Sequence, residues 1–242
     1  MISFIVPAHN EELWIGKCLA SIRTTMEKLA DPYEVIVVDD ASTDSTPEIA
    51  EQMGARTIRV EHRKISAVRN AGAREACGEV FFFVDADTQV NERAVGAALR
   101  VIRTGAAGGA CVFEFDGPEP LWGRIIHRFA VTMGRLIRLA GGCFLFCTRQ
   151  AYAATGGFSE NLYAGEDIAF VQALKKIGRF VVPKPAVVSS GRKLSVVGPW
   201  EVIMLLGRIV LRGPRYENKK VLDILYGQRA QDSKEQVEEG KR

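Results

Sequence analysis

The chain has 242 residues, of which 47% are hydrophobic and 25% charged, and its formal net charge is +3. This length suits one large domain or two small ones, and the composition is ordinary for a globular protein. So small a charge does not indicate a nucleic-acid partner, and we expect none. The sequence contains no run of ~18 apolar residues, so we expect no membrane span.

The N-terminus and the cysteines bear on the location of the protein. The apolar run at residues 2–6 is too short for the core of a signal peptide, and no basic region precedes it. The five cysteines lack C-x-x-C spacing, which is typical of reduced core residues. We therefore expect a cytoplasmic protein.

The first hundred residues alternate between short apolar runs and helical patterns. The apolar runs, rich in Val, Ile and Phe, predict strands at 2–6, 34–38, 56–60 and 80–84. Helical spacing and capping residues predict helices at 12–29, from Pro47, at 66–77 and from Asn91 to Arg103. This alternation predicts an α/β fold with a mostly parallel central sheet and helices on both faces.

The pattern changes after residue 105. Strands are predicted at 107–115 and 142–147, and helices at 121–140, near 167–177, at 200–211 and, more weakly, at 222–230. Residues 231–242 are charged and nearly free of apolar side chains, which predicts a flexible tail. We expect one domain at 1–230, with a nucleotide-sugar-binding half at 1–105 and an acceptor-binding half at 106–230.

Polar and mostly acidic residues follow three of the predicted strands. They are His9-Asn10-Glu11, Asp39-Asp40 and Asp85-Ala86-Asp87. Parallel strands end at the same edge of a sheet, where open α/β folds bind ligands. Carboxylates gathered there need cations or hydrogen-bond donors to compensate them. Paired carboxylates suit Mg²⁺ or Mn²⁺ with a diphosphate, and acids also accept hydrogen bonds from ribose hydroxyls.

Six motifs, taken in order, resemble the family 2 glycosyltransferases, which have the Rossmann-like GT-A fold. The motifs are Ile5-Val6-Pro7-Ala8-His9-Asn10-Glu11-Glu12, Val37-Val38-Asp39-Asp40-Ala41-Ser42-Thr43-Asp44, Arg69-Asn70-Ala71-Gly72, Asp85-Ala86-Asp87, Gly156-Gly157-Phe158 and Gly165-Glu166-Asp167. The resemblance covers residues 2–167. It implies a metal-dependent, inverting glycosyltransferase that uses a nucleoside diphosphate sugar.

The resemblance also implies roles for residues that bind the donor. The loop Pro7-Ala8-His9-Asn10-Glu11 is expected to hold the nucleoside, with Glu11 on the ribose. Asp40, beside Asp39, is expected to face the base, as in relatives that use uridine, which favours UDP. Arg69 and Asn70 are expected beside the nucleotide, although Arg69 could instead pair with a surface acid. Apart from the resemblance, Arg192 is expected to compensate the diphosphate charge, the alternative being a solvated pair with Lys193.

Further implied roles concern the metal and the acceptor. Asp85 is expected to reach the ribose or the metal, and Asp87 to bind the metal, which is Mn²⁺ or Mg²⁺. Asp167 is expected to be the general base that deprotonates the acceptor hydroxyl, with Glu166 supporting it. A positioned carboxylate suits this role because a hydroxyl is a poor nucleophile until it loses its proton.

Two positions depart from the family pattern. His9 stands where many members have Tyr or Phe. The Q-x-x-R-W motif of processive synthases is absent after Asp167, and Ser190-Gly191-Arg192-Lys193 occupies the corresponding region. This departure favours the addition of single sugars over polymerisation.

Simpler interpretations stay open beside these. Asp39 and Asp40 could cap a turn, and Glu166 with Asp167 could open a helix, where acids favour the positive end of the dipole. Two other function classes are a sugar nucleotidyltransferase and a non-catalytic nucleotide-sugar-binding module. The first normally opens with a Gly-rich loop, whereas here the first glycine is Gly16.

The predicted helix at 121–140 has two interpretations. It combines an apolar stripe with Arg124, Arg128, Arg135 and Arg138, and residues 121–140 contain no acid. Such a helix can lie on an anionic membrane surface at the inner face of the membrane, which would suit a lipid-linked acceptor. Alternatively it packs on the core and exposes a solvated basic face.

Overall fold

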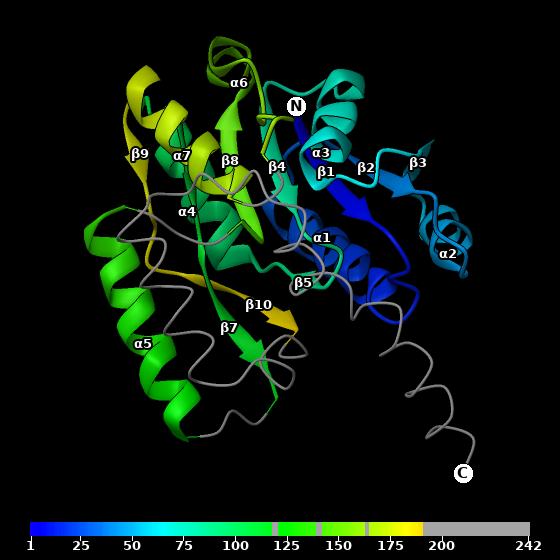
Figure 1. Cartoon of the computed structure of the whole chain (residues 1–242), viewed down its shortest axis with the longest axis horizontal. Helices are drawn as coiled ribbons and strands as arrows, with labels where there is room; N and C mark the ends of the chain where they lie inside the picture. The colour runs from blue at the N-terminus through cyan, green and yellow to red at the C-terminus, as the bar shows by residue number, and fades with distance from the viewer. Residues whose placement is uncertain (118–120, 139–141, 163–164, 191–242) are drawn as a thin grey trace.

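The computed structural model of the chain describes residues 1–117, 121–138, 142–162 and 165–190 (Figure 1). The helices expected at 200–211 and 222–230, the tail at 231–242 and the side chain of Arg192 lie outside these residues. Among the described residues, no helix has the length and hydropathy that a membrane span requires.

A seven-stranded sheet forms the centre of the molecule, in the order β3-β2-β1-β4-β8-β6-β9. Its strands are β1 (Ile2–Ala8), β2 (Tyr33–Asp40), β3 (Arg56–Val60), β4 (Val80–Val84), β6 (Gly108–Ala110), β8 (Phe144–Thr148) and β9 (Phe180–Val181). β8 runs antiparallel to both β4 and β6, while the other four neighbouring pairs are parallel. The prediction of a mostly parallel sheet is therefore confirmed.

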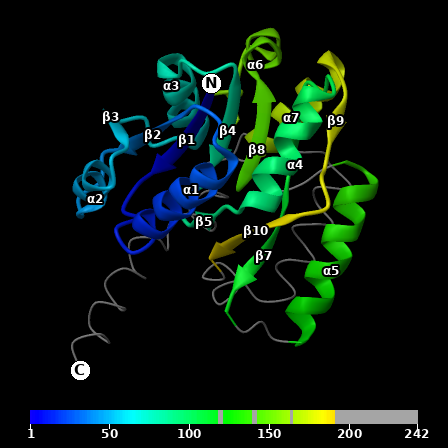
Figure 2. The ribbon, with the colours of Figure 1, turned by 180° about the vertical axis from the view of Figure 1, so that it is seen from behind.

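Helices cover both faces of this sheet, as predicted (Figures 1 and 2). One face carries α1 (Ile15–Leu29), α2 (Thr46–Gln52) and α4 (Glu92–Arg103). The other carries α3 (Ile65–Glu75), α6 (Arg149–Thr155) and α7 (Glu166–Ile177). The sheet continues across position 105, because β4 pairs with β8 along its whole length.

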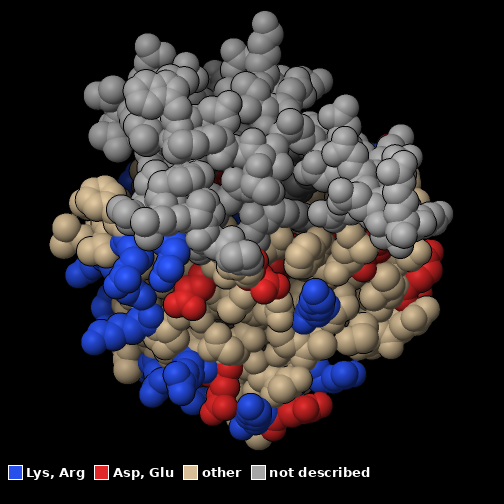
Figure 3. Space-filling view, turned by 90° about the horizontal axis from the view of Figure 1, so that it is seen from below, with Lys and Arg blue, Asp and Glu red and all other residues tan. Residues whose placement is uncertain are grey.

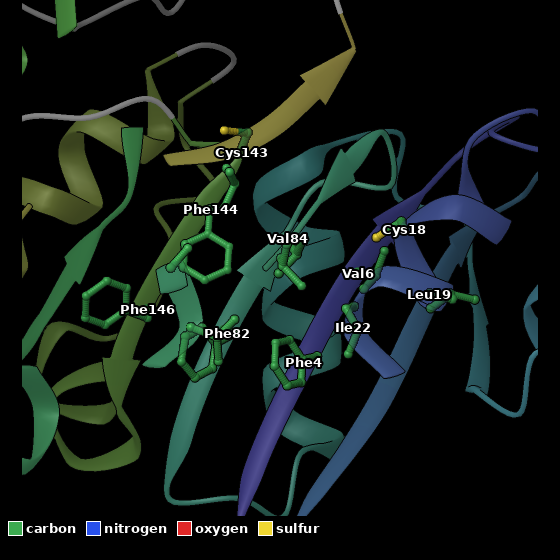
Figure 4. Close-up of a cluster of buried hydrophobic side chains, with 14 of the residues drawn as sticks. Phe4, Val6, Cys18, Leu19, Ile22, Phe82, Val84, Cys143, Phe144 and Phe146 are labelled. Carbon is green, nitrogen blue, oxygen red and sulfur yellow. The ribbon is translucent and has the colours of Figure 1, made fainter. Parts of the chain in front are cut away.

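Alternating side chains of the strands fill two separate cores. Phe4 and Phe82 stack at 5.0 Å between ring centroids and pack toward α1 and α4 (Figure 4). Ile5 and Phe83 point to the opposite face, toward α3 and α7. Both faces of β1 and β4 are buried, which explains why β4 contains no polar residue and why β1 contains only one, Ser3.

Helix α3 lies unusually close to the sheet. A Cβ atom at Gly72 would lie 2.5 Å from Ile5 Cγ2 and 2.8 Å from Val38 Cγ2, so only glycine allows this approach. Arg69, in the preceding turn of α3, contacts Asp85 directly after the carboxyl end of β4.

A second sheet was not predicted. It has three strands in the order β5-β10-β7, which are β5 (Thr88–Gln89), β10 (Ala186–Ser190) and β7 (Val112–Asp116). The single strand expected at 107–115 is wrong, because the chain leaves β6 at Cys111 and enters this sheet as β7. β6 also packs against its neighbours too closely for a side chain, since a Cβ at Gly109 would lie 2.1 Å from Val181 O.

Two further helices differ from the expectation. The short helix α6 was missed, although Thr148 caps it by accepting a hydrogen bond from the Ala151 N–H at 3.0 Å. The helix expected at 121–140 is α5 (Leu121–Leu136), which lies beside the second sheet (Figure 1). Arg135 on α5 donates a hydrogen bond to Lys184 O at 2.7 Å.

Candidate active site

The loops that follow β1 and β2 are hydrogen-bonded to each other. Asn10 donates its backbone N–H to Ser42 Oγ at 2.9 Å, and its side-chain Oδ1 accepts from the Thr43 N–H at 2.8 Å. Asn10 and Ala41 have left-handed backbones, with φ of 53° and 55°. Because this conformation is unfavourable for most residues, contacts between the loops must hold it.

His9 joins these two loops to the loop after β3. Its Nδ1 lies 2.8 Å from Asp40 O, and its Nε2 lies 3.0 Å from Arg63 Nη1. Arginine can only donate, so Nε2 accepts and the ring proton is on Nδ1, where it donates to the carbonyl. The position that is aromatic in many relatives therefore holds an imidazole bonded to an arginine. Arg63 was not predicted to belong to the site, and no sequence pattern marks it.

Asp39 and Asp40 are both buried and accept hydrogen bonds from loop N–H groups. Asp40 Oδ1 accepts from His62 N at 2.6 Å and from Arg63 N at 3.1 Å. Asp39 Oδ1 accepts from Ser42 N at 3.2 Å. The turn-capping interpretation therefore holds for Asp39, whereas Asp40 fixes the loop that follows β3. The expected contact of Asp40 with a base stays a prediction.

The remaining residues of the first loop continue β1. Pro7 and Ala8 are buried and pair in register with Val38 and Asp39. Glu11 is buried, and its N–H donates to Thr46 Oγ1 at 2.8 Å, at the start of α2. The loop expected to hold the nucleoside is thus fixed by β2 and α2.

The acids that follow β1 and β4 influence one buried thiol on α1. Burial raises the pKa of Cys18 on α1, and the negative charges of Asp87, Asp85 and Glu11 raise it further. Cys18 Sγ lies 3.7 Å from Asp85 O. The charges of three acids that are predicted to share one sheet edge therefore all act on this thiol.

Arg69 connects two parts of the site. Its side chain is 2% exposed, and its Nη2 lies 2.9 Å from Asp85 Oδ1 while its Nη1 lies 3.2 Å from Glu166 Oε1. Nη2 also donates to Gly142 O at 3.2 Å. Burial alone would lower the pKa of Arg69, but Asp85 and Glu166 raise it, so the guanidinium is charged.

Asn70 binds the loop that follows α6. Its Oδ1 accepts from Tyr152 OH at 2.7 Å and Phe158 N at 2.9 Å, and its Nδ2 donates to Phe158 O at 2.9 Å and Glu160 Oε1 at 2.8 Å. These contacts use both polar atoms of the amide for the loop. The expected place of Asn70 beside a nucleotide stays a prediction.

Glu166 and Asp167 occupy the first turn of α7, after Gly165, whose φ is 79°. Burial raises the pKa of Glu166, Arg69 lowers it and Asp167 raises it, with a net upward shift. Asp167 Oδ1 accepts from Ile168 N at 2.7 Å. The positive end of the helix dipole stabilises acids in the first turn. The simpler interpretation, that Glu166 and Asp167 open a helix, therefore holds as well.

Gly142 lies against the side chain of Asp167. A Cβ atom at Gly142 would lie 2.7 Å from Asp167 Oδ2 and 3.0 Å from Asp167 Cβ. Gly142 was not predicted to belong to the site. The adjacent glycines at 141 and 142 mark a turn before β8, but nothing in the sequence shows that the turn meets Asp167.

The residues expected to bind a metal follow β4. Asp87 is 5% exposed, and the side chain of Asp85 is 19% exposed. The described part of the chain contains no group of three His, Cys, Asp or Glu arranged to hold a metal. Two carboxylates still fit Mg²⁺ or Mn²⁺, because these ions commonly take their other ligands from substrate phosphates and water.

The chain is similar in sequence to known proteins. The family model described as glycosyl transferase family 2 matches residues 3–153. A dolichol-phosphate mannosyltransferase of Pyrococcus furiosus is 28% identical over 144 residues, which are 56% of this chain and 40% of that protein. The chain spans only 26% and 40% of the lengths of two curated relatives that it matches, of which the mannosyltransferase is the second.

Solved structures with the GT-A fold resemble this one. The mannosyltransferase PcManGT of Pyrobaculum calidifontis, in complex with GDP-Man and Mn²⁺, matches with a TM-score of 0.65 and 22% identity, over 81% of this chain and 59% of that one. S. aureus TarS 1-349 with UDP-GlcNAc matches with a TM-score of 0.61 and 22% identity, over 89% and 68%. These similarities confirm the expected fold.

The family model covers most of the first sheet and four of the six motifs, and it ends before the motifs at 156–158 and 165–167. The six motifs, the sheet order and this match agree, and the chain belongs to glycosyl transferase family 2.

Proposed function

We propose that this protein transfers one sugar from a nucleoside diphosphate sugar to an acceptor hydroxyl, with inversion at the anomeric carbon and with Asp167 as the general base. One observation carries this proposal: Arg69 joins Asp85, at the end of β4, to Glu166, which directly precedes Asp167 on α7. The acids assigned to the donor and those assigned to the acceptor therefore meet at a single edge of the sheet.

The reaction is a single displacement. The acceptor hydroxyl loses its proton to Asp167 as its oxygen attacks the anomeric carbon. The bond from this carbon to the diphosphate oxygen breaks, and the electron pair leaves with the diphosphate. Attack opposite the leaving group inverts the anomeric centre. A positioned carboxylate base contributes typically 10²–10⁴-fold to such a step.

The divalent cation is part of the proposal. Asp85 and Asp87 would hold Mn²⁺ or Mg²⁺, which stabilises negative charge on a departing diphosphate. The relatives support this assignment, since PcManGT was solved with Mn²⁺. Family membership also favours sugar transfer over nucleotidyl transfer and over a non-catalytic module.

The relatives indicate only in part which nucleobase the donor carries and what the acceptor is. TarS was solved with UDP-GlcNAc and PcManGT with GDP-Man. We favour UDP because of Asp40. The similarity to a dolichol-phosphate mannosyltransferase supports a lipid-linked acceptor as one candidate.

A thermal-shift panel tests this function. UDP, GDP and TDP sugars are each added with Mn²⁺, and the melting temperature is measured. A ligand that binds only the folded protein stabilises it by about 2.7 kcal/mol at a hundredfold excess over its Kd. We expect a UDP sugar to give the largest shift. If no nucleotide sugar changes the melting temperature, the proposed function is wrong.

A further inference from the structure

We infer that Arg69 is a positioning residue, which orients Asp85 for the donor diphosphate and its cation and at the same time fixes Glu166 and the start of α7 for the acceptor. This inference rests on the proposed function. It replaces the expectation that Arg69 lies beside the nucleotide with a role exerted through the two carboxylates.

The geometry of Arg69 supports a bridging role. Its two terminal nitrogens contact different carboxylates, Asp85 at 2.9 Å and Glu166 at 3.2 Å, which lie 81 positions apart in the sequence. A planar guanidinium has donors in a rigid fork and can hold two acids in one fixed arrangement. Lysine has a single charged nitrogen on a flexible chain and cannot reproduce this arrangement.

The surroundings hold Arg69 itself in place. The guanidinium carbon lies 5.2 Å from the ring centroid of Phe158, which stacks on Phe170 of α7 at 4.1 Å between centroids. The neighbouring residue, Asn70, fixes the loop that carries Phe158. Arg69 holds Glu166 at the start of α7, and Asn70 holds the loop after α6. These two consecutive residues of α3 therefore both position the acceptor half against the sheet edge.

The contact with Asp85 is directly relevant to cation binding. Arg69 Nη2 donates a hydrogen bond to Asp85 Oδ1, and this bond orients the carboxylate. Residues that orient a metal ligand without touching the metal typically contribute 10–100-fold to metal affinity or activity. Loss of Arg69 would also leave buried acids without their compensating charge, which is strongly unfavourable.

The test compares nucleotide binding with and without Mn²⁺. UDP and GDP are titrated by calorimetry into the wild-type protein, Arg69→Met and Arg69→Lys, in Mn²⁺ and in EDTA. For the nucleotide that the wild type binds, we expect Arg69→Met to lose roughly 10–100-fold in the Mn²⁺-dependent affinity, with affinity in EDTA unchanged. Arg69→Lys should recover only part of the loss, because it restores one contact of the two.

A second arginine provides a matched control. Arg149 lies 4.9 Å from the ring centroid of Phe81 on β4 and donates to Gly78 O at 2.8 Å, at the opposite end of that strand from Asp85. Arg149→Met should lower the melting temperature without changing the Mn²⁺ dependence of nucleotide binding.

Glu166→Gln tests the acceptor side. It should leave the affinity for the nucleotide unchanged, while the kcat of sugar transfer falls.

The outcomes separate this inference from the proposed function. A folded Arg69→Met protein with the wild-type Mn²⁺ dependence overturns the inference alone. If Arg69→Met does not fold, Arg69→Lys decides: wild-type binding and kcat in that variant overturn it, and a folded variant with weaker Mn²⁺-dependent binding supports it. A wild-type protein that binds neither nucleotide in Mn²⁺ contradicts the proposed function, and this inference with it.

Discussion

Asp167 is the residue on which the proposed chemistry depends most. Its carboxylate lies in the first turn of α7, accepts the Ile168 N–H and packs against Gly142. Asp167→Asn keeps the shape of the side chain but removes its proton affinity. We expect kcat to fall by roughly 10²–10⁴ while donor affinity hardly changes. The control is Asp31→Asn, at a partly exposed carboxylate that pairs with Arg103. A loss confined to donor affinity would reassign Asp167 to binding.

Gly142 offers a second test that leaves the carboxylate in place. A methyl group at Gly142 would lie 2.7 Å from Asp167 Oδ2, so the Asp167 side chain must turn away. Gly142→Ala should therefore lower kcat with little change in the melting temperature. In Gly16→Ala the new methyl group meets only Ile49, at 3.6 Å, and full activity is expected. Wild-type kcat in Gly142→Ala would show that the orientation of Asp167 is unimportant.

Some of these residues could be predicted from the sequence and others could not. Asp85, Asp87 and Glu11 follow apolar runs of strand length, and this pattern predicts that they lie at one edge of the sheet. Arg63 and Gly142 reach the site through contacts between loops distant in the sequence, which no local pattern encodes. The roles of Arg69 and Asn70 likewise became visible only through their partners.

At the level of whole elements, α3 depends on its close approach to the sheet. A methyl group at Gly72 would overlap Ile5 and Val38, and overpacking of this kind typically costs 1–3 kcal/mol. Gly72→Ala should lower the free energy of unfolding by about that amount, measured by denaturant titration.

The same Gly→Ala substitution in helix α4 should raise the free energy of unfolding instead of lowering it. Gly96 lies inside α4, and its added methyl group would meet Leu29 at an ordinary 3.5 Å. Alanine is favoured over glycine in a helix by roughly 0.5–1 kcal/mol, so Gly96→Ala should stabilise the protein. If both variants are stabilised, α3 does not pack on the sheet as closely as described.

The elements of the first half were easier to predict than those of the second. β1 to β4 are apolar runs of strand length separated by helical patterns, and their positions agree with the prediction to within a few residues. Beyond β4, β5 and β9 have only two residues each, and the chain changes sheets at Cys111. A pattern of side-chain periodicity carries no information about which sheet a short strand joins.

At the scale of the whole molecule, α5 presents an exposed apolar stripe. Phe129, Met133, Leu136 and Ile137 recur at intervals of three and four residues and are 38–76% exposed. Lysine and arginine side chains gather on the left side of the face in Figure 3, the side on which α5 and α7 lie in Figure 1. This exposure favours the surface interpretation of α5 over core packing.

A membrane-binding measurement separates the two interpretations. If α5 lies on anionic lipid, the protein should bind anionic vesicles at low salt and be released by added salt, because salt screens surface charge. Each basic residue contributes on the order of 1 kcal/mol. Replacing Arg124, Arg128 and Arg135 by Gln should abolish binding, and the same change at Arg23, Arg93 and Arg100 should weaken it less. A wild-type protein that ignores such vesicles contradicts this interpretation.

We propose that the acids at the end of β4 bind a nucleotide through a divalent cation, and calorimetry on Asp87→Ala is the sharpest test of this binding. UDP and GDP are titrated into the wild type, Asp87→Ala and the control Asp31→Ala, in Mn²⁺ and in EDTA. We expect Mn²⁺ to strengthen nucleotide binding in the wild type and the control but not in Asp87→Ala, which keeps the same circular dichroism. Equal affinity of the wild type in Mn²⁺ and EDTA, or an undiminished effect of Mn²⁺ in Asp87→Ala, would contradict the account.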